Sequence, residues 1–86
     1  MSLDAALVEE VGSTLERLLA EEKKPLAEIR RLYPGLHFSQ CDAADMTDEP
    51  FRPGPRFDLY LVDGRNACLH LTHDLTTATG LVLAMR

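Results

Sequence analysis

Apolar side chains recur at steps of three and four positions near the start of the chain, which is the period of an amphipathic α-helix. This pattern predicts a first helix with one apolar stripe and a charged opposite face. Gly12 lies inside it at a cost of about 1 kcal/mol relative to alanine, so it implies either a close backbone contact or a weak point. The stripe consists of Leu3, Leu7, Val8, Val11, Leu15, Leu18 and Leu19.

A second, shorter helix is predicted to start at Pro25, because proline suits the first turn of a helix. Pro34 and Gly35 should end it. Arg30 and Arg31 fall in its last turn, where positive charge compensates the helix dipole. Its apolar positions are Leu26, Ile29, Leu32 and Tyr33.

Beyond the second helix, side-chain character alternates with a period of two, as expected for strands that bury one face. Residues 36–41, 57–62 and 68–72 show this alternation and predict three strands. Residues 81–85 are apolar throughout and predict a fourth. Because an uncovered apolar strand would expose backbone donors and apolar area, the fourth strand should either be buried within the sheet or pair in a homodimer.

The turn-forming residues 63–66 join the second and third strands into a β-hairpin. A two-residue turn at Asp63 and Gly64 would put the apolar residues out of register, with Leu59 opposite Cys68. A three-residue loop, 64–66, keeps four leucines on the buried face and needs a left-handed conformation at Asn66, which asparagine tolerates. It pairs Leu61 with Leu69, Leu59 with Leu71, Tyr60 with His70 and Val62 with Cys68.

Two other connections carry signals of their own. Residues 42–56 form a long loop that is acidic in its first half and rich in proline and glycine in its second. Loops of this length in compact domains are usually functional or mobile. Asp74 is predicted to cap a single helical turn that Gly80 closes.

Together these elements predict one α+β domain over residues 1–86. Two N-terminal helices would pack on one face of a mainly antiparallel four-stranded sheet, with a short helical turn before the last strand. The chain is long enough for one core, and its 45% hydrophobic and 27% charged residues are ordinary for a globular protein. The predicted core residues of the sheet are Leu36, Phe38, Leu59, Leu61, Leu69 and Leu71.

The net charge of −5 argues against a generic nucleic-acid-binding or anionic-membrane-binding protein, because both depend on positive charge. No apolar run reaches membrane-spanning length, and the acidic N-terminal segment lacks the pattern of a signal peptide. We therefore expect a cytoplasmic protein whose two cysteines are free thiols.

Four strings of strand and turn residues, PGLHF (34–38), FDLYLVD (57–63), CLHLT (68–72) and ATGLVLA (78–84), resemble a small uncharacterised bacterial family associated with nitrogen-fixation gene neighbourhoods. The resemblance covers roughly the C-terminal two-thirds of the chain and fixes a fold better than an activity. It brings no catalytic or ligand-binding residues. What it implies is an accessory role.

Cys41, Cys68, His70 and His73 include a Cys-x-His-x-x-His run. Thiolate and imidazole groups suit zinc, copper or iron, but this spacing is not that of a standard zinc site. We favour ordinary sheet residues and expect no cofactor, with a zinc or iron site as the alternative.

The carboxylates Asp42, Asp45, Asp48 and Glu49 could bind a hard cation, but they lack the ligand ladder and central glycine of an EF-hand loop. A solvated or helix-capping loop is the favoured interpretation.

Tyr60, His70 and Asp58 could form an acid/base group, because histidine titrates near neutrality. No activated nucleophile, phosphate-binding glycine loop or paired catalytic carboxylates accompany them in the sequence. An enzyme is therefore the least favoured function.

The leading hypothesis is a non-catalytic accessory or protein-interaction domain that binds a protein partner or itself, with contacts through Tyr60, His70, Leu81 and Leu83. The alternative is a metal- or redox-responsive module that uses Cys41, Cys68 and His70.

Overall fold

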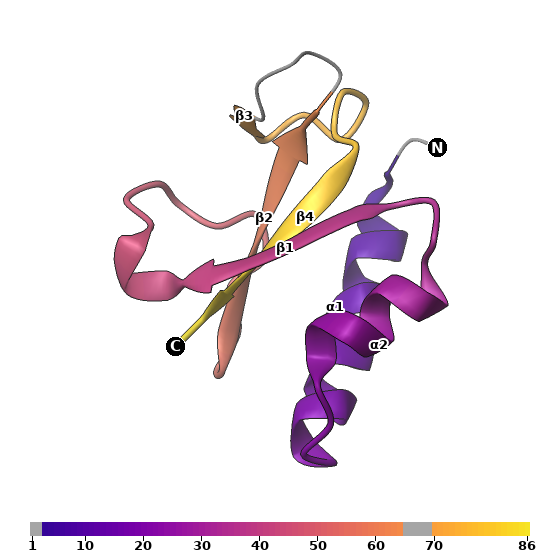
Figure 1. Ribbon diagram of the computed structural model, residues 1–86. Coiled ribbons are helices and arrows are strands. Elements are labelled where there is room, and N and C mark those ends of the chain that lie inside the picture. Colours follow the sequence, from indigo (N-terminus) through magenta and orange to yellow (C-terminus); the bar gives the residue numbers. More distant parts are fainter. Residues whose placement is uncertain (1–2, 65–69) are drawn as a thin grey trace.

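The computed structural model describes residues 3–64 and 70–86 (Figure 1). Two helices, α1 (Ala5–Ala20) and α2 (Pro25–Leu32), lie on one face of a four-stranded sheet. The strands are β1 (His37–Asp42), β2 (Phe57–Asp63), β3 (His70–Thr72) and β4 (Gly80–Met85), and a 3-10 turn (Ala43–Asp45) follows β1. The predicted α+β fold is confirmed.

Both helices begin where the sequence signals place them. The Asp4 side chain accepts a 2.7 Å hydrogen bond from the Leu7 backbone N–H and so caps α1, and Pro25 occupies the first turn of α2. Arg30 does more than compensate the dipole of α2. Its Nη2 donates to the Phe38 carbonyl at 2.8 Å and so ties α2 to β1. Neither described helix is long and apolar enough to cross a membrane.

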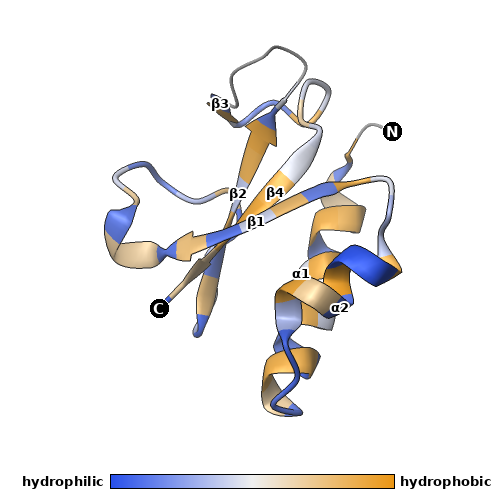
Figure 2. Ribbon diagram, in the orientation of Figure 1, coloured by the Kyte–Doolittle hydropathy of each residue, from blue (hydrophilic) through white to orange (hydrophobic). Residues whose placement is uncertain are grey.

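The strand order is β1-β4-β2-β3. The last strand therefore lies inside the sheet, parallel to β1 and antiparallel to β2. Of the two alternatives for this apolar strand, burial within the sheet is confirmed. Figure 2 shows that β2 and β4 are the most continuously hydrophobic strands, as befits the two in the middle.

The predicted register of the β2–β3 hairpin is wrong. Leu61 pairs with Thr72 instead of Leu69, and Val62 pairs with Leu71. An odd shift of register turns every side chain of a strand to the other face, so Leu71 lies on the side away from the helices, where it is 40% exposed.

The physical reason is that β4, not β3, supplies the apolar neighbours of β2. Leu59 pairs with Leu83 and Leu61 with Leu81, which fills the positions that the predicted hairpin gave to the leucines of the third strand. The predicted pair of Tyr60 with His70 is also wrong, because His70 pairs with Asp63. The expectations for Asn66, Cys68 and Leu69 lie outside the described residues.

Two glycines, Gly12 and Gly80, lie so close to neighbouring atoms that a larger side chain would collide with them. Gly12 lies under the guanidinium of Arg52, where an added Cβ would be 2.5 Å from Cζ, so the predicted close contact exists but involves a side chain. Gly80 does not close the preceding turn with a positive φ. It begins β4, where an added Cβ would lie 2.7 Å from His37 Cβ and 2.9 Å from the carbonyl carbon of His37.

The predicted helical turn before the last strand is confirmed. The Asp74 carbonyl accepts hydrogen bonds from the N–H groups of Thr77 and Ala78, and its side chain accepts from the Thr76 N–H at 2.9 Å. On the helix side of the sheet, the turn adds Ala78 to a core that contains Val8, Val11, Leu15, Ile29, Leu36, Phe38, Phe57, Leu59, Leu61, Leu81 and Leu83.

Candidate functional site

The side of the sheet opposite the helices, called here the second face, is apolar at its centre. Strand pairing also places the buried Asp58 and, at the β1 edge, His37 and Ser39 on this side. Tyr60, Val62, Val82 and Ala84 form a separate cluster there and are 5%, 3%, 9% and 0% exposed. An antiparallel sheet covered by one layer of helices commonly presents polar side chains on its other side. The apolar second face therefore needs a cover of its own.

Strand pairing sets which residues border this cluster. Cys41 of β1 lies beside Ala84, and Leu71 of β3 lies beside Val62. Because paired residues point to the same side of a sheet, both side chains belong to the second face. Cys41 is partly buried, whereas Leu71 is exposed.

Residues 43–49 supply part of the cover (Figure 1). Ala43 and Met46 pack against the second-face cluster. The Tyr60 hydroxyl donates a 2.8 Å hydrogen bond to the Asp48 carbonyl, and His73 Nε2 lies 3.2 Å from the Glu49 carbonyl oxygen. The acidic half of the loop is therefore held across the sheet from β1 to the end of β3.

The second half of the same loop crosses the edge of β2 to the helix side. The N–H groups of Phe51 and Arg52 donate to the Leu59 carbonyl, and the Leu59 N–H donates to the Arg52 carbonyl. Arg52 then reaches α1, where its Nε lies 3.1 Å from Glu9 Oε1 and its Nη1 3.8 Å from Glu16 Oε1. Residues 42–56 thus contact both sides of the sheet.

The acidic side chains of this loop all lie in residues 42–49, whereas its two arginines, Arg52 and Arg56, lie in the second half. Asp42, Asp45, Asp48 and Glu49 are all exposed, and residues 32–51 contain no lysine or arginine. The other ten acidic residues are almost balanced by nine basic ones, so these four carboxylates account for four of the five net negative charges.

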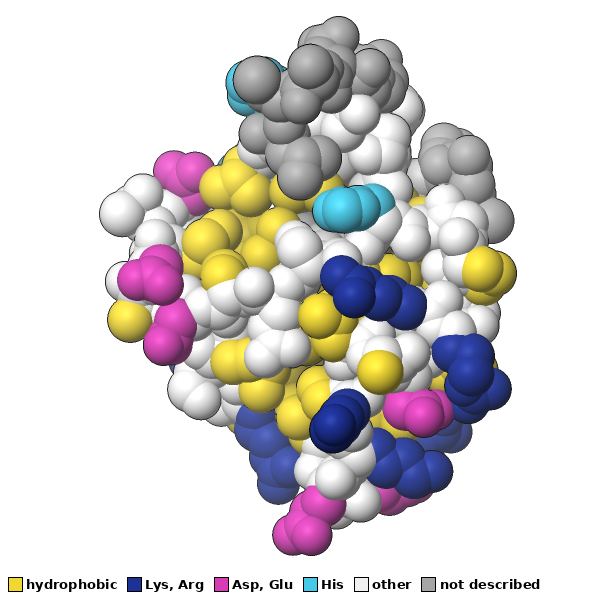
Figure 3. Space-filling view, in the orientation of Figure 1, with side chains coloured by type: hydrophobic (Ala, Val, Ile, Leu, Met, Phe, Trp, Pro, Cys, Tyr) yellow, Lys and Arg dark blue, Asp and Glu magenta, His cyan; other side chains and the backbone are white. Residues whose placement is uncertain are grey.

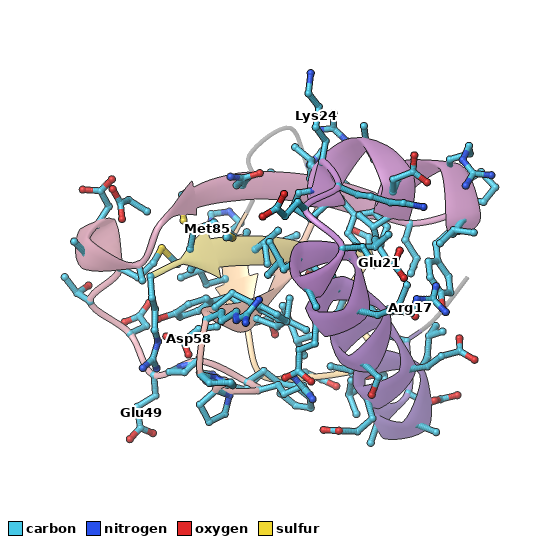
Figure 4. All side chains as sticks on the ribbon, turned by 90° about the horizontal axis from the view of Figure 1, so that it is seen from below. Arg17, Glu21, Lys24, Glu49, Asp58 and Met85 are labelled. Atoms are coloured by element: carbon cyan, nitrogen blue, oxygen red, sulfur yellow. The ribbon has the colours of Figure 1, made fainter. Side chains whose placement is uncertain are left out.

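Several acidic groups elsewhere are neutralised by arginines, because Glu9, Glu28 and Asp58 form ion pairs with Arg52, Arg31 and Arg86. No ion pair is found for the four loop carboxylates within the described ranges. Figure 3 shows acidic side chains along one border of a hydrophobic patch, with most basic side chains elsewhere on the view, and Figure 4 shows Glu49 pointing away from the strands.

The three members of the suggested acid/base group have separate partners. The Asp58 carboxylate is buried and accepts hydrogen bonds from Arg86 Nη2 at 2.7 Å and from the Gly54 N–H at 3.3 Å. The Tyr60 hydroxyl is bonded to the loop, as described above, and His70 is an exposed residue opposite Asp63. The structure therefore does not bring the three functional groups together.

The structure also separates the candidate metal ligands. Cys41 lies on β1 and His70 on β3, at opposite edges of the sheet, which at about 4.8 Å per strand places them at least about 14 Å apart. Burial raises the pKa of the Cys41 thiol, and the carboxylates of Asp45 and Asp42 raise it further, which disfavours the thiolate that binds metals. His73 contacts the loop backbone instead.

No group of three or more His, Cys, Asp or Glu side chains suited to a metal ion is found within residues 3–64 and 70–86, which include the four loop carboxylates. Cys68 lies outside these ranges.

Two of the residues suggested for partner contacts lie in the core. Leu81 and Leu83 are 0% and 2% exposed on the helix side, and Tyr60 is buried on the second face. Of the four residues suggested for partner contacts, only His70 is exposed to solvent. Leu71, which the sequence pattern placed in the core, is exposed instead.

The sequence did contain a signal for the second face. Tyr60 and Val62 alternate with the leucines of β2, and residues 81–85 are apolar at every position. Strands that are apolar on both sides must be covered on both sides, which one layer of helices cannot do.

We expect replacement of Tyr60 by phenylalanine to loosen the acidic loop, because it removes the hydroxyl that holds the Asp48 carbonyl. The free energy of unfolding should fall by about 1 kcal/mol, the usual net value of one hydrogen bond. Cleavage of the native protein by endoproteinase Asp-N at Asp45 and Asp48 should become faster. Tyr33→Phe is the matched control, because it removes a hydroxyl that bonds to Glu10 on the helix side. Equal cleavage rates in the two variants would contradict the expectation.

No curated protein and no solved structure matches this chain. A family model described as a family of unknown function, DUF6129, matches residues 13–86, which include all four strands, α2 and the second half of α1. The match covers far more than half of the chain, so the protein belongs to this family of unknown function, DUF6129.

Proposed function

We propose that this protein is a non-catalytic protein-interaction domain and that its partner binds to the second face of the sheet. One observation carries the proposal. The centre of the second face is apolar, residues 43–49 cover part of it, and Leu71 is left 40% exposed at its border. Exposed apolar surface next to an otherwise buried cluster is typical of protein contact sites.

The resemblance described under Sequence analysis suggests the setting. In this proposal the protein is a cytoplasmic accessory to nitrogen-fixation machinery. It needs no cofactor, so elemental analysis of a tag-free preparation should find no stoichiometric zinc or iron. Stoichiometric metal that is lost in Cys68→Ser would instead favour the metal- or redox-responsive module.

The position of the contact surface can be tested by site-specific photo-crosslinking in cells of the native host. A photoreactive amino acid replaces Leu71 in one variant and Leu32 of α2 in the other. These two leucines are 40% and 43% exposed and lie on different sides of the molecule, so they form a matched pair.

We expect the Leu71 variant to crosslink to a defined protein and the Leu32 variant not to do so. Crosslinking at neither position, at both equally, or at Leu32 alone would overturn the proposal.

A further inference from the structure

We propose that the second face binds a basic amphipathic segment of a partner protein, with its apolar side chains on Leu71 and its lysines or arginines against the acidic half of the loop. This inference rests on the function proposed above and adds the chemistry of the partner. The carboxylates concerned are those of Asp42, Asp45, Asp48 and Glu49, called here the acidic border.

The position of the acidic border relative to the apolar surface supports the inference. Asp42 is the last residue of β1, and the loop then runs over the second face to Glu49, whose carbonyl oxygen contacts His73 just after β3. Leu71 lies two positions before His73. The loop that carries the carboxylates therefore runs beside the apolar cluster from β1 to the end of β3.

The contacts that hold the loop leave its charges available. Tyr60 and His73 both bind backbone carbonyls, of Asp48 and Glu49, and not the carboxylates of these residues. The loop is thus fixed in place while its side chains remain exposed. A preformed charged border favours binding, because little conformational entropy is lost when the partner arrives.

Charge selects among the possible occupants of this surface. A second copy seated with its own acidic border on this one would be repelled, and so would nucleic acids and anionic lipids, which carry the same sign of charge. Arg86, on the same face, is bonded to the buried Asp58. A basic segment would be attracted, since complementary charge at the rim of an interface speeds association and selects partners. The partly buried Met46 and the exposed Leu71 add apolar contact area that a small cation could not use.

The test uses the 86-residue chain and two short synthetic peptides as probes. One peptide is an amphipathic helix of leucine and lysine, and the other has glutamate in place of every lysine. Binding is followed by isothermal titration calorimetry and mapped by chemical-shift changes in the labelled protein.

We expect the leucine–lysine peptide to bind, with shifts at Leu71, Met46 and residues 42–49 and none on α2. The glutamate peptide should not bind. At an ionic strength of about 1 M, where the Debye length is about 3 Å, the affinity should fall at least fivefold. Shifts spread over the whole surface or centred on α2, or equal binding of the two peptides, would overturn the inference.

Charge variants provide the matched control. Asp45→Asn together with Glu49→Gln should weaken binding about fivefold, because two rim charges are lost. Glu21→Gln together with Glu22→Gln, at the end of α1, changes the net charge equally and should leave the affinity unchanged. An equal loss of affinity in both double variants would show that binding depends only on the net charge of the protein, which contradicts the inference.

A second readout separates this inference from the function on which it rests. Photo-crosslinking at Leu71 can capture a protein while Asp45→Asn with Glu49→Gln does not reduce the yield. In that case the proposed protein-interaction function is supported, and the inference that the partner segment is basic is wrong. Light scattering that shows a dimer through this face, or binding of anionic vesicles or nucleic acid to it, would also overturn the inference.

Discussion

Replacing Gly80 by alanine is expected to destabilise the protein by about 3 kcal/mol or more, the upper range for overpacking a filled core. The methyl group would lie 2.7 Å from His37 Cβ and 2.9 Å from the carbonyl carbon of His37. The atoms that the methyl group would meet belong mostly to the His37 backbone. Gly80 is paired with β1 on one side and β2 on the other, so neither strand can move away without breaking hydrogen bonds of the sheet.

Gly12→Ala is the control for this prediction. Its methyl group meets only the guanidinium of Arg52, the far end of a flexible side chain. Alanine also gains about 1 kcal/mol of helix propensity over glycine, which offsets the loss of the exposed Arg52–Glu9 pair. We therefore expect little net change. Urea unfolding followed by circular dichroism, which needs no tryptophan, compares the two variants. A smaller loss of stability in Gly80→Ala than in Gly12→Ala would contradict the close approach of β1 and β4.

Leu61→Ala is expected to cost about 2 to 5 kcal/mol, the usual range for a leucine in a filled core. Leu61 is 1% exposed and lies between Leu81 of β4 and Thr72 of β3. Leu71→Ala should cost less than about 1 kcal/mol, because its side chain is 40% exposed and changes at the surface are usually small.

The comparison tests the register of β2 and β3 directly. In the register expected from the sequence, Leu71 would face Leu59 in the core, and the two alanine variants would lose similar stability. In the observed register Leu71 borders the second face, and the losses differ severalfold. The same unfolding measurement decides between the two, and equal losses would restore the register expected from the sequence.

Local signals explain why the helices were predictable. The Asp4 cap, the apolar stripe of α1 and Pro25 at the start of α2 act over one or two turns of chain, so their meaning does not depend on distant residues. The cap of Asp74 on its helical turn is local in the same way. The role of Gly80 was not local, because the residue it accommodates, His37, lies on another strand.

The sequence predicted only part of the candidate site. The acidic loop and the apolar residues on both sides of β2 and β4 are visible in the sequence. Their contact is not visible, because it depends on the loop folding back over the second face through Tyr60 and His73. The same dependence separated Cys41 from His70, since two strands come between them in the sheet but not in the pattern of residues.

The sequence by itself determined the type and approximate limits of α1, α2 and the four described strands, the α+β class and the need to bury the last strand, because periodicity, caps and turn residues act locally. Only the tertiary structure decided the strand order, the register of β3 and the position of the acidic border beside Leu71. Those features depend on which apolar strand occupies the centre of the sheet. Once β4 lies between β1 and β2, its leucines complete the helix-side core, and Leu71 is left on the other side.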